Sequence, residues 1–424
     1  MQNNIFILGG KPYKLDLTEI VYNFDTVYRL NCNILYMGDA SNDIYYLNHH
    51  VYENFFKQKK SFEQLKKIYE FIESKLIENF LDIINNNKYK DIMCQFEQCS
   101  NNKSNSILEK IKCPIKFNKQ PRCGYQCILY NILIGIKPTV CNFSFKDEEG
   151  FTNNVQKKIS LCHDTKSEIK VLHWLHNNNY IDATLCMLED HELPVLDCQN
   201  LNINPDIVYL LIKQFGICIL RNYYDKDTIE GINKEFERVF LEHKDKKLIL
   251  DTENCSCDER IHNTEKYSEY IKNKFSDNNL FNFIAGTYQK YKNGILGSHK
   301  KTLINLLEYE EGKIKNSGAG WHRDNNDCQF KAIMYLSDVT SKNGPFTWIT
   351  KSSKKYIGVP KTRPGRSSRF FDDTIEDLLN NNKTCKKIEI CGNKGDIILA
   401  DTTYVHRGKI IEEGSRKAIT QYFF

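Results

Sequence analysis

The chain has 424 residues, 41% of them hydrophobic, and a formal net charge of +5. One hydrophobic core rarely serves a chain of this length, so two domains are expected. The small net charge, with no dominant Lys/Arg block, argues against nucleic acid as a partner. No stretch approaches the roughly 20 apolar residues that span a bilayer, so no membrane span is expected.

The cysteines point to a reducing compartment. The sequence has 16 of them, scattered and without a Cys-x-x-Cys pair. This spacing favours free thiols over disulfides or a zinc site. The first residues lack the charged region and apolar core of a signal peptide. We therefore expect a cytoplasmic protein with reduced cysteines.

The first half alternates short apolar runs with amphipathic segments, which is typical of an α/β domain with a mostly parallel sheet. The expected strands are 5–8, 24–31, 43–47 and 139–143. The expected helices are 61–84, 121–134 and 166–177. A Gly9-Gly10 turn follows the first strand, where open α/β sheets bind phosphate groups.

Three stretches of this half, FDTVYRLN, PRCGYQCILYNILIGIKPTVCNFSF and CHDTKSEIKVLHWLHNNNYI, occur in that order. Together with the glycine turn they resemble sialyltransferase-like glycosyltransferases over roughly residues 4–190. The resemblance implies a Rossmann-like domain, residues 1–195, with His163 as a candidate base. It also implies a nucleotide-sugar cleft lined by Gly9, Gly10, Arg29, Asn31 and Gly124. The turn reads Gly-Gly-Lys-Pro-Tyr and departs from the family's Gly-x-Gly-Pro-Ser, which leaves a non-catalytic substrate- or nucleotide-binding module as the alternative.

A polar, proline-containing segment from 189 to 205 follows, and we place the domain boundary near residue 195. A helix over 205–215 begins with proline and ends at Gly216, and a strand over 216–220 comes next. Asp225 or Asp227 is expected to cap the following helix.

Two His-x-Asp sequences occur in the second half. His243-x-Asp245 ends an amphipathic helical pattern and is interpreted as a solvated helix end. His322-x-Asp324 lies between expected strands, where residues two apart point to the same face. His406 stands far downstream. Two histidines and a carboxylate on one face of a metal are the ligands of non-haem Fe(II) oxygenases.

The rest of the second half shows short strand patterns. They cover 303–309, 331–336, 346–349, 397–400 and 416–424. Asn343-Gly344 is typical of a hairpin turn between the second and third. Many short strands closed by glycine turns favour a double-stranded β-helix, the jelly-roll or cupin shape, for residues 196–424, with flanking helices.

Five stretches, LLEYEEG, GAGWHRDNND, KAIMYLSDVTSKNGPFTWITKSSKK, GNKGDIILADTTYVHRG and GSRKAITQYFF, follow one another here. Over 204–424 the chain resembles phytanoyl-CoA dioxygenase-like proteins. The resemblance implies an Fe(II)- and 2-oxoglutarate-dependent oxygenase in which His322, Asp324 and His406 hold iron, with ascorbate as an accessory reductant. Asp324 retains the carboxylate that halogenating enzymes of this fold replace with a small residue, which favours hydroxylation.

Arg416, ten residues after His406, is the candidate partner for the distal carboxylate of 2-oxoglutarate. A guanidinium group matches a carboxylate in two parallel hydrogen bonds. Thr420, on the same strand face, and Tyr309 are further candidates for this co-substrate. Strand packing is the alternative interpretation for Thr420 and Tyr309.

The candidate substrate contacts are Trp321 and a basic insert that contains Arg363 and Arg366. The charge of this insert suggests an anionic substrate, and a solvated loop is the alternative. The substrate class stays open between a small molecule, a glycan and a protein side chain. The fusion itself suggests that the second domain hydroxylates an acceptor to which the first transfers a sugar; a non-enzymatic cupin-like scaffold is a third hypothesis.

Overall fold

The computed structural model describes residues 5–8, 24–30, 43–47, 61, 63–64, 91–94, 101–119, 121–141, 143, 165–187, 193–199, 203–249, 251–252, 255–291, 300–318, 320–324, 329–353, 362–363 and 366–423. For Arg29, Arg363 and Arg366 it describes the backbone alone. The predicted site residues Gly9, Gly10, Asn31 and His163, and most of the predicted helix 61–84, lie outside the described residues.

The chain divides into two compact units, residues 1–188 with 200–207 and residues 189–199 with 208–424. The predicted boundary near residue 195 falls at strand β6 (Val195–Asp197), which pairs with β7 (Ile217–Arg221) in the second unit.

The first unit contains a parallel sheet in the order β4-β3-β2-β1-β5. Its strands are β1 Ile5–Leu8, β2 Thr26–Leu30, β3 Asp43–Leu47, β4 Asp91–Cys94 and β5 Thr139–Cys141. Its helices are α5 Asn101–Lys110, α6 Cys123–Leu133, α8 Thr165–Asn177 and the short 3-10 turn η3 Thr184–Met187. Ile7, Ile128 and Leu172 are fully buried in one core, so both α6 and α8 pack on the sheet. The glycosyltransferase-like character of this unit stays a prediction.

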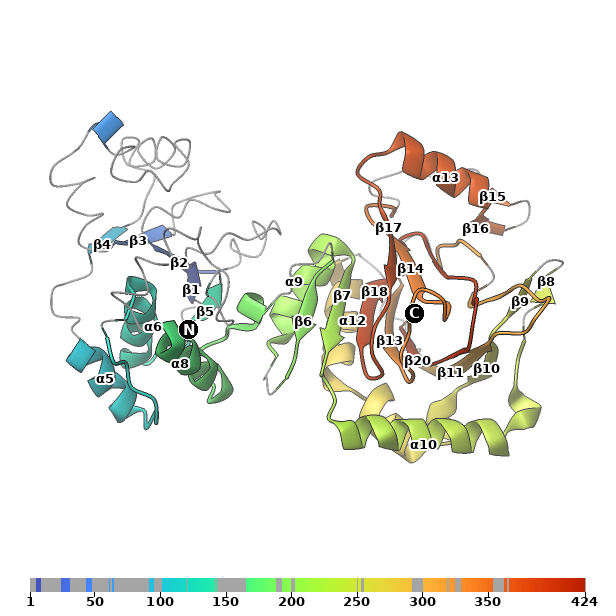
Figure 1. Ribbon diagram of the computed structural model, residues 1–424, viewed down its shortest axis with the longest axis horizontal. Helices are drawn as coiled ribbons and strands as arrows, with labels where there is room; N and C mark the ends of the chain where they lie inside the picture. The colour runs from blue at the N-terminus through green and yellow to red at the C-terminus, as the bar shows by residue number, and fades with distance from the viewer. Residues whose placement is uncertain are drawn as a thin grey trace. The chain divides into compact units, whose positions relative to one another are not determined.

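The second unit contains two facing groups of strands (Figure 1). The larger sheet has the order β10-β11-β20-β13-β18-β7-β6 and is antiparallel except for the β6–β7 pair. Its remaining strands are β10 Glu259–His262, β11 Lys300–Glu308, β13 Phe330–Tyr335, β18 Ile397–Asp401 and β20 Ser415–Phe423. The smaller sheet is antiparallel, in the order β17-β14-β19, with β14 Phe346–Ile349, β17 Lys387–Ile390 and β19 His406–Gly408. This two-sheet arrangement is that of a jelly roll.

Helices and short strands complete this unit. They are α9 Pro205–Phe215, which begins in the first unit's range, α10 Lys226–Glu242, α11 Glu269–Ile271, α12 Asn279–Tyr291, α13 Asp372–Asn381, η4 Lys244–Lys246, η5 Thr264–Lys266, η6 Lys272–Ser276, β8 Asp251–Thr252, β9 Cys255–Cys257, β12 Lys315–Asn316, β15 Thr362–Arg363 and β16 Arg366–Phe370. Asp225 caps α10, as predicted: its carboxylate accepts a hydrogen bond from the backbone N–H of Thr228 at 2.6 Å. The buried residues of α10 include Ile232, Phe236 and Val239, so its apolar stripe faces the protein.

The predicted hairpin at Asn343-Gly344 is wrong. β13 pairs with β18 and β20, whereas β14 pairs with β17 and β19, so the turn carries the chain from the larger sheet to the smaller one. Gly344 has φ +71°, the left-handed conformation that glycine adopts at no steric cost. An Asn-Gly pair therefore predicts a local bend of the backbone, but it does not predict that the strands on its two sides pair with each other.

None of the described helices is long and apolar enough to cross a membrane. Among the cysteines whose side chains are described, none forms a disulfide.

Candidate active site

The two histidines predicted to bind a metal lie directly opposite each other. The backbone N–H of His322 donates to the carbonyl of His406 at 3.0 Å, and the N–H of His406 donates to the carbonyl of His322 at 2.9 Å. Residues that exchange both hydrogen bonds in an antiparallel pair point their side chains to the same face. The two imidazole centroids are accordingly 4.3 Å apart.

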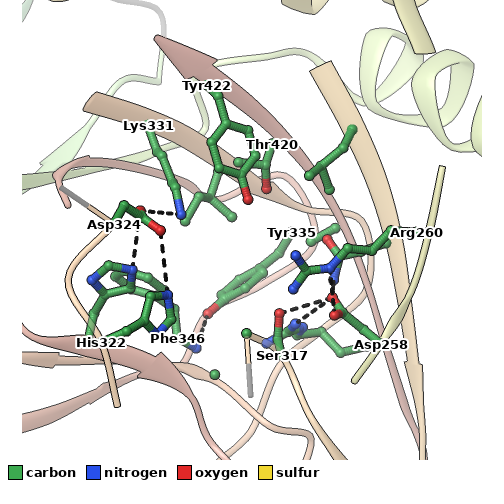
Figure 2. Close-up of a pocket in the computed structure, with 18 of the residues that line it drawn as sticks. Asp258, Arg260, Ser317, His322, Asp324, Lys331, Tyr335, Phe346, Thr420 and Tyr422 are labelled. Carbon is green, nitrogen blue, oxygen red and sulfur yellow. Dashed lines mark hydrogen bonds and ion pairs between the residues drawn. The ribbon is translucent and has the colours of Figure 1, made fainter. Parts of the chain in front are cut away.

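The carboxylate of Asp324 completes the group. The backbone N–H of Asp324 donates to the carbonyl of Thr402 at 3.0 Å, which keeps the chain extended after His322. One carboxylate oxygen lies 3.5 Å from His322 Nε2 and the other lies 3.5 Å from His406 Nε2. Figure 2 shows the Asp324 carboxylate facing the His322 imidazole.

Both imidazoles are held with Nε2 toward the carboxylate. His322 Nδ1 lies 2.8 Å from the carbonyl of Gly320, and His406 Nδ1 lies 2.9 Å from the carbonyl of Tyr404. A carbonyl only accepts, so each Nδ1 carries the proton and each Nε2 presents a lone pair. Burial, and next the nearby His406, lower the pKa of His322 to about 4, so its imidazole is neutral at physiological pH.

These residues fit a divalent metal ion. One ligand atom from each of His322, Asp324 and His406 lies within 4.8 Å of the other two. Ligands about 2.1 Å from a common metal are about 3–4 Å from one another, in line with the 3.5 Å separations. His406 Nε2 is buried and has no hydrogen-bond partner within the described structure, an arrangement that a metal would satisfy.

Lys331 adds a charge that the sequence analysis did not assign to the site. Its Nζ lies 2.5 Å from the second oxygen of Asp324 and 4.4 Å from the ring centroid of Tyr422. The contact with Asp324 is an ion pair without the angles of a good hydrogen bond. Burial alone would raise the pKa of Asp324, but Lys331, followed by His406, holds it well below its usual value. Asp324 is therefore ionised and ready to bind a cation.

His322, Asp324 and His406 line a cavity of about 120 Å³ between the two sheets. The larger sheet contributes side chains from β10, β11, β13 and β20, and the smaller one contributes Phe346 and His406. The lining residues alternate along each strand, since every second side chain points to the same face. On β13 these are Lys331, Ile333 and Tyr335. Figure 2 shows Lys331 and Tyr335 of the larger sheet and Phe346 of the smaller sheet around this cavity.

Arg416 lines the same cavity and is 4% exposed. It donates through Nη1 to the carbonyl of Gly344, while its Nε has no hydrogen-bond partner within the described residues. Its Nη2 lies 4.0 Å from the carboxylate of Asp258. Burial lowers the pKa of Arg416, which means that its charge is incompletely compensated. A carboxylate ligand would supply a hydrogen-bond acceptor for Nε and a negative charge to balance the guanidinium of Arg416.

Asp258 organises the surroundings of Arg416. Its carboxylate lies 2.7 Å from Arg260 Nε and accepts hydrogen bonds from Asn305 Nδ2 at 2.6 Å and Ser317 Oγ at 2.9 Å. Because Arg260 lies closer to the carboxylate than Arg416 does, Asp258 neutralises Arg260 more than it neutralises Arg416. Figure 2 shows Asp258, Arg260 and Ser317 grouped on one side of the cavity.

Of the other predicted site residues that the structure describes, only Thr420 lines the cavity. Thr420 is 6% exposed and lines the cavity. Tyr309 follows the end of β11, is 47% exposed and is not among the residues that line the cavity. Gly124 lies buried in α6, and most of its predicted companions lie outside the described residues.

Trp321 does not reach the cavity. It packs in a separate cluster with Ile349, Phe370 and Val405, and the guanidinium of Arg407 lies 4.3 Å from its ring centroid. Since it neighbours His322 on an extended segment, its side chain points to the opposite face. Arg363 and Arg366 face each other across the β15–β16 pair, with only their backbone described.

Several lining residues were not among the predicted site residues. Strand alternation places Tyr422 on the same face as Arg416, and alternation on β13 places Lys331 on the face of Ile333 and Tyr335. No comparable signal marked Asp258 and Arg260, because their stretch, Cys255 to His262, has no apolar alternation.

No family model matches the sequence, and no curated protein matches it. Similar solved structures include the epimerase SnoN, in complex with Fe3+, alpha ketoglutarate and nogalamycin RO, at 13% identity and a TM-score of 0.39, covering 52% of this chain and 83% of SnoN. The alpha ketoglutarate dependent carbocyclase SnoK shows 14% identity and a TM-score of 0.36, covering 52% of this chain and 84% of its own.

EctD from S. alaskensis shows 15% identity and a TM-score of 0.37, covering 52% of this chain and 78% of EctD. Solved EctD structures contain bound Fe, or 2-oxoglutarate and 5-hydroxyectoine. Identities and TM-scores this low carry no argument about activity, so function must be inferred from the side chains themselves.

Proposed function

We propose that the second unit is an Fe(II)- and 2-oxoglutarate-dependent oxygenase that hydroxylates its substrate. One observation carries the proposal: a complete two-histidine, one-carboxylate group and an undercompensated buried arginine line the same cavity. Three protein ligands leave positions open for a 2-oxo acid and dioxygen. The combination of ligand set and carboxylate receptor fits this class better than a structural metal site, which is closed by four protein ligands.

In this proposal His322, Asp324 and His406 hold the metal, and their Nδ1 hydrogen bonds and backbone pairing fix both imidazoles before it binds. Bound iron would supply the redox chemistry that couples oxidative decarboxylation of 2-oxoglutarate, to succinate and carbon dioxide, with insertion of one oxygen atom into a C–H bond of the substrate. Arg416 would bind the distal carboxylate of 2-oxoglutarate and so orient the co-substrate.

The cavity walls would contribute by excluding water. Phe346 and Ile333 line the cavity with apolar surface, and the fully buried Trp348 packs behind, stacked on Tyr404 at a ring-centroid distance of 4.8 Å. A dry cavity strengthens the attraction between Arg416 and a carboxylate. The choice of hydroxylation over halogenation is supported by Asp324, whose carboxylate occupies the position that a halide would need.

Anaerobic calorimetric titration tests the proposal directly. We expect one Fe(II) per chain and 2-oxoglutarate binding that becomes much tighter once the metal is bound, because the 2-oxo acid would contact both metal and Arg416. Equal affinity for 2-oxoglutarate with and without metal would reject the shared site.

For the first unit, the corresponding proposal is that it binds a nucleotide-sugar and transfers the sugar to the hydroxyl group that the second unit creates. The parallel sheet, whose first strand is followed in the sequence by two glycines, supports a nucleotide site at the carboxyl ends of the strands. The alternative is a non-catalytic module that presents substrate. Incubation with nucleotide-sugars and a hydroxylated acceptor separates the two: absence of both transfer and nucleotide release, with substrate still bound, rejects sugar transfer.

A further inference from the structure

A row of side chains with cationic groups crosses the larger sheet at the end opposite Arg416. In the strand register Tyr422 of β20 lies between Lys301 of β11 and Lys331 of β13. Directly paired residues of neighbouring strands point to the same face. Lys331 and Tyr422 line the cavity, so Lys301 faces the same side, at its margin.

β10 extends the positive charge along this face. Arg260 pairs with Asn305, and His262 pairs with Leu303. Asn305 and Leu303 both line the cavity, so Arg260 and His262 lie on that face too. Figure 2 shows Lys331, Tyr422 and Thr420 near one another, with Arg260 next to Asp258.

The charges of this cavity do not cancel. Apart from Arg369, which has partners of its own, the described lining residues include three cationic side chains and two carboxylates, which leave one positive charge in excess. The cations are Arg260, Lys331 and Arg416, and the carboxylates are Asp258 and Asp324. A bound Fe(II) and a 2-oxoglutarate dianion would cancel each other and leave the same excess. Lys301 adds a further charge for which no carboxylate partner lies within the described structure.

His262 lies among the same positive charges. Burial, followed by the charges of Lys301 and Arg260, lowers its pKa to about 4, although Asp258 acts in the opposite direction. Burying excess like charge is costly unless a ligand of opposite charge compensates it.

We propose that the row formed by Lys301, Tyr422 and Lys331 binds an anionic group, a carboxylate or a phosphate, of the substrate. The assignment to a substrate rests on the proposed oxygenase function, whereas the binding of an anion by these side chains does not. Two ammonium groups and one phenol supply the donors such a group needs.

This anion site is distinct from the predicted co-substrate site. Arg416 and Tyr422 are six residues apart on β20, about 20 Å along an extended strand, so one small anion does not bridge their positions. Lys331 touches Asp324, so an anion held at the row lies beside the metal ligands. An anionic substrate anchored there would have its neighbouring carbon atoms near the metal ligands, whereas Arg416, at the other end of β20, would bind 2-oxoglutarate.

Lys301 gives the cleanest test, because Lys331 contacts a metal ligand. The variant is Lys301→Gln, and the matched control is Lys300→Gln. Lys300 is the preceding residue on the same strand, is exposed and pairs with Asp277 on the other face. Urea unfolding of both variants verifies that each is folded before any ligand is added.

The probes are inorganic phosphate and acetate, titrated by calorimetry at low ionic strength into two forms of the full chain. One form is loaded with Mn(II) and 2-oxoglutarate, which occupies Arg416. The other is metal-free Arg416→Met, which removes that arginine as a competing anion site. We expect saturable binding of at least one probe in both forms, weakened about tenfold by Lys301→Gln and unchanged by Lys300→Gln, because a hydrogen bond to a charged group is lost.

The outcomes separate the two proposals. Unchanged affinity in Lys301→Gln, or no saturable binding of either probe in either form, overturns the anion site even if metal and 2-oxoglutarate bind. Binding that depends on Lys301 in a protein with no affinity for Fe(II) retains the anion site and overturns the oxygenase. Preference for phosphate over acetate, or the reverse, identifies which anionic group the substrate carries.

Discussion

His243-x-Asp245 and His322-x-Asp324 have the same spacing but lie in different structural settings. His243 caps the C-terminus of α10, and Asp245 lies in η4, where its side chain is 66% exposed and pairs with Lys246 at 2.8 Å. The ring of His243 packs on Tyr267 instead, at a centroid distance of 4.2 Å. The sequence-based interpretation of this pair as a helix end is confirmed.

At the second pair the backbone is extended, and His322 is hydrogen-bonded to His406 from a distant strand. The difference teaches that the spacing supplies only two ligands on one face. The third ligand, the carbonyl partners of both Nδ1 atoms and the burial all come from tertiary structure. The variants below are arranged to break or sharpen this contrast.

The largest effect is expected from removing a ligand. His406→Ala should lower Fe(II) affinity by more than about 100-fold, because even residues that only orient ligands contribute 10- to 100-fold. His243→Ala should leave the affinity unchanged. Metal titration of the two variants measures this, and comparable losses in both would contradict the assignment.

The second largest effect is expected on the binding of 2-oxoglutarate. Arg416→Met should weaken 2-oxoglutarate binding about 100-fold in the metal-loaded protein, because two charge-assisted hydrogen bonds are lost, while Fe(II) affinity stays the same. The control is Lys417→Met, since Lys417 points to the other face and pairs with Glu237. Calorimetry with 2-oxoglutarate distinguishes them, and retained affinity in Arg416→Met would exclude this arginine as the receptor.

Asp258→Ala tests the buried ion pair. In this variant Arg260, whose side chain is 15% exposed, loses the carboxylate that lies 2.7 Å away. Because an unpaired buried charge is costly, the free energy of unfolding should fall by about 3 kcal/mol. Asp245→Ala removes an exposed ion pair and should have no measurable effect. Urea denaturation compares the two, and a neutral Asp258→Ala would show that the cluster contributes nothing to stability.

Gly318 tests the packing around His322. A Cβ at Gly318 would meet Cε1 of the His322 ring at 2.8 Å, so Gly318→Ala should displace the imidazole and weaken Fe(II) binding about tenfold. Gly312→Ala is the matched control: its φ of +77° resembles the +83° of Gly318, but its added Cβ meets no atom within 4 Å. Equal affinities in these variants would mean that the ring moves freely.

The last expected effect is a pH dependence of the stability of the metal-free protein. Burial lowers the pKa of both His322 and His262 from 6.5 to about 4. Between these values the unfolded chain binds more protons than the folded one, so stability should fall as pH drops from 6.5 toward 4. The double variant His322→Asn with His262→Asn should flatten this slope, which His243→Asn should not. A slope unaffected by the double variant would contradict the burial of both rings.

Much of the second unit follows from its sequence. The strands β7, β11, β13, β18 and β20 lie within two or three residues of their predicted ranges, because each combines apolar residues with a glycine or polar boundary. Asp225 marks the start of α10 through an oxygen that accepts a backbone hydrogen bond. The His322-x-Asp324 spacing predicts two metal ligands on one face, and the resemblance over 204–424 adds His406 as the third ligand and Arg416 as the 2-oxoglutarate partner.

Other features depend on contacts that no local pattern encodes. β10 contains one fully buried apolar residue, Ile261, so nothing in its sequence marks a strand or the importance of Asp258 beside it. Alternation along β13 predicts that Lys331 faces inward. Its ion pair with Asp324 is a tertiary contact between β13 and the segment that carries the metal ligands, and no local pattern predicts it. Strand pairing across Asn343-Gly344 was likewise decided by the two-sheet topology and not by the turn.

The most direct test of the oxygenase is the formation of succinate from 2-oxoglutarate by the full chain with Fe(II), measured with and without dioxygen. We predict oxygen-dependent succinate release above the rate without protein, abolished in His406→Ala, strongly lowered at subsaturating 2-oxoglutarate in Arg416→Met, and retained in His243→Ala and Lys417→Met. Succinate release that survives His406→Ala, or its absence from a protein shown to bind both Fe(II) and 2-oxoglutarate, would contradict the account.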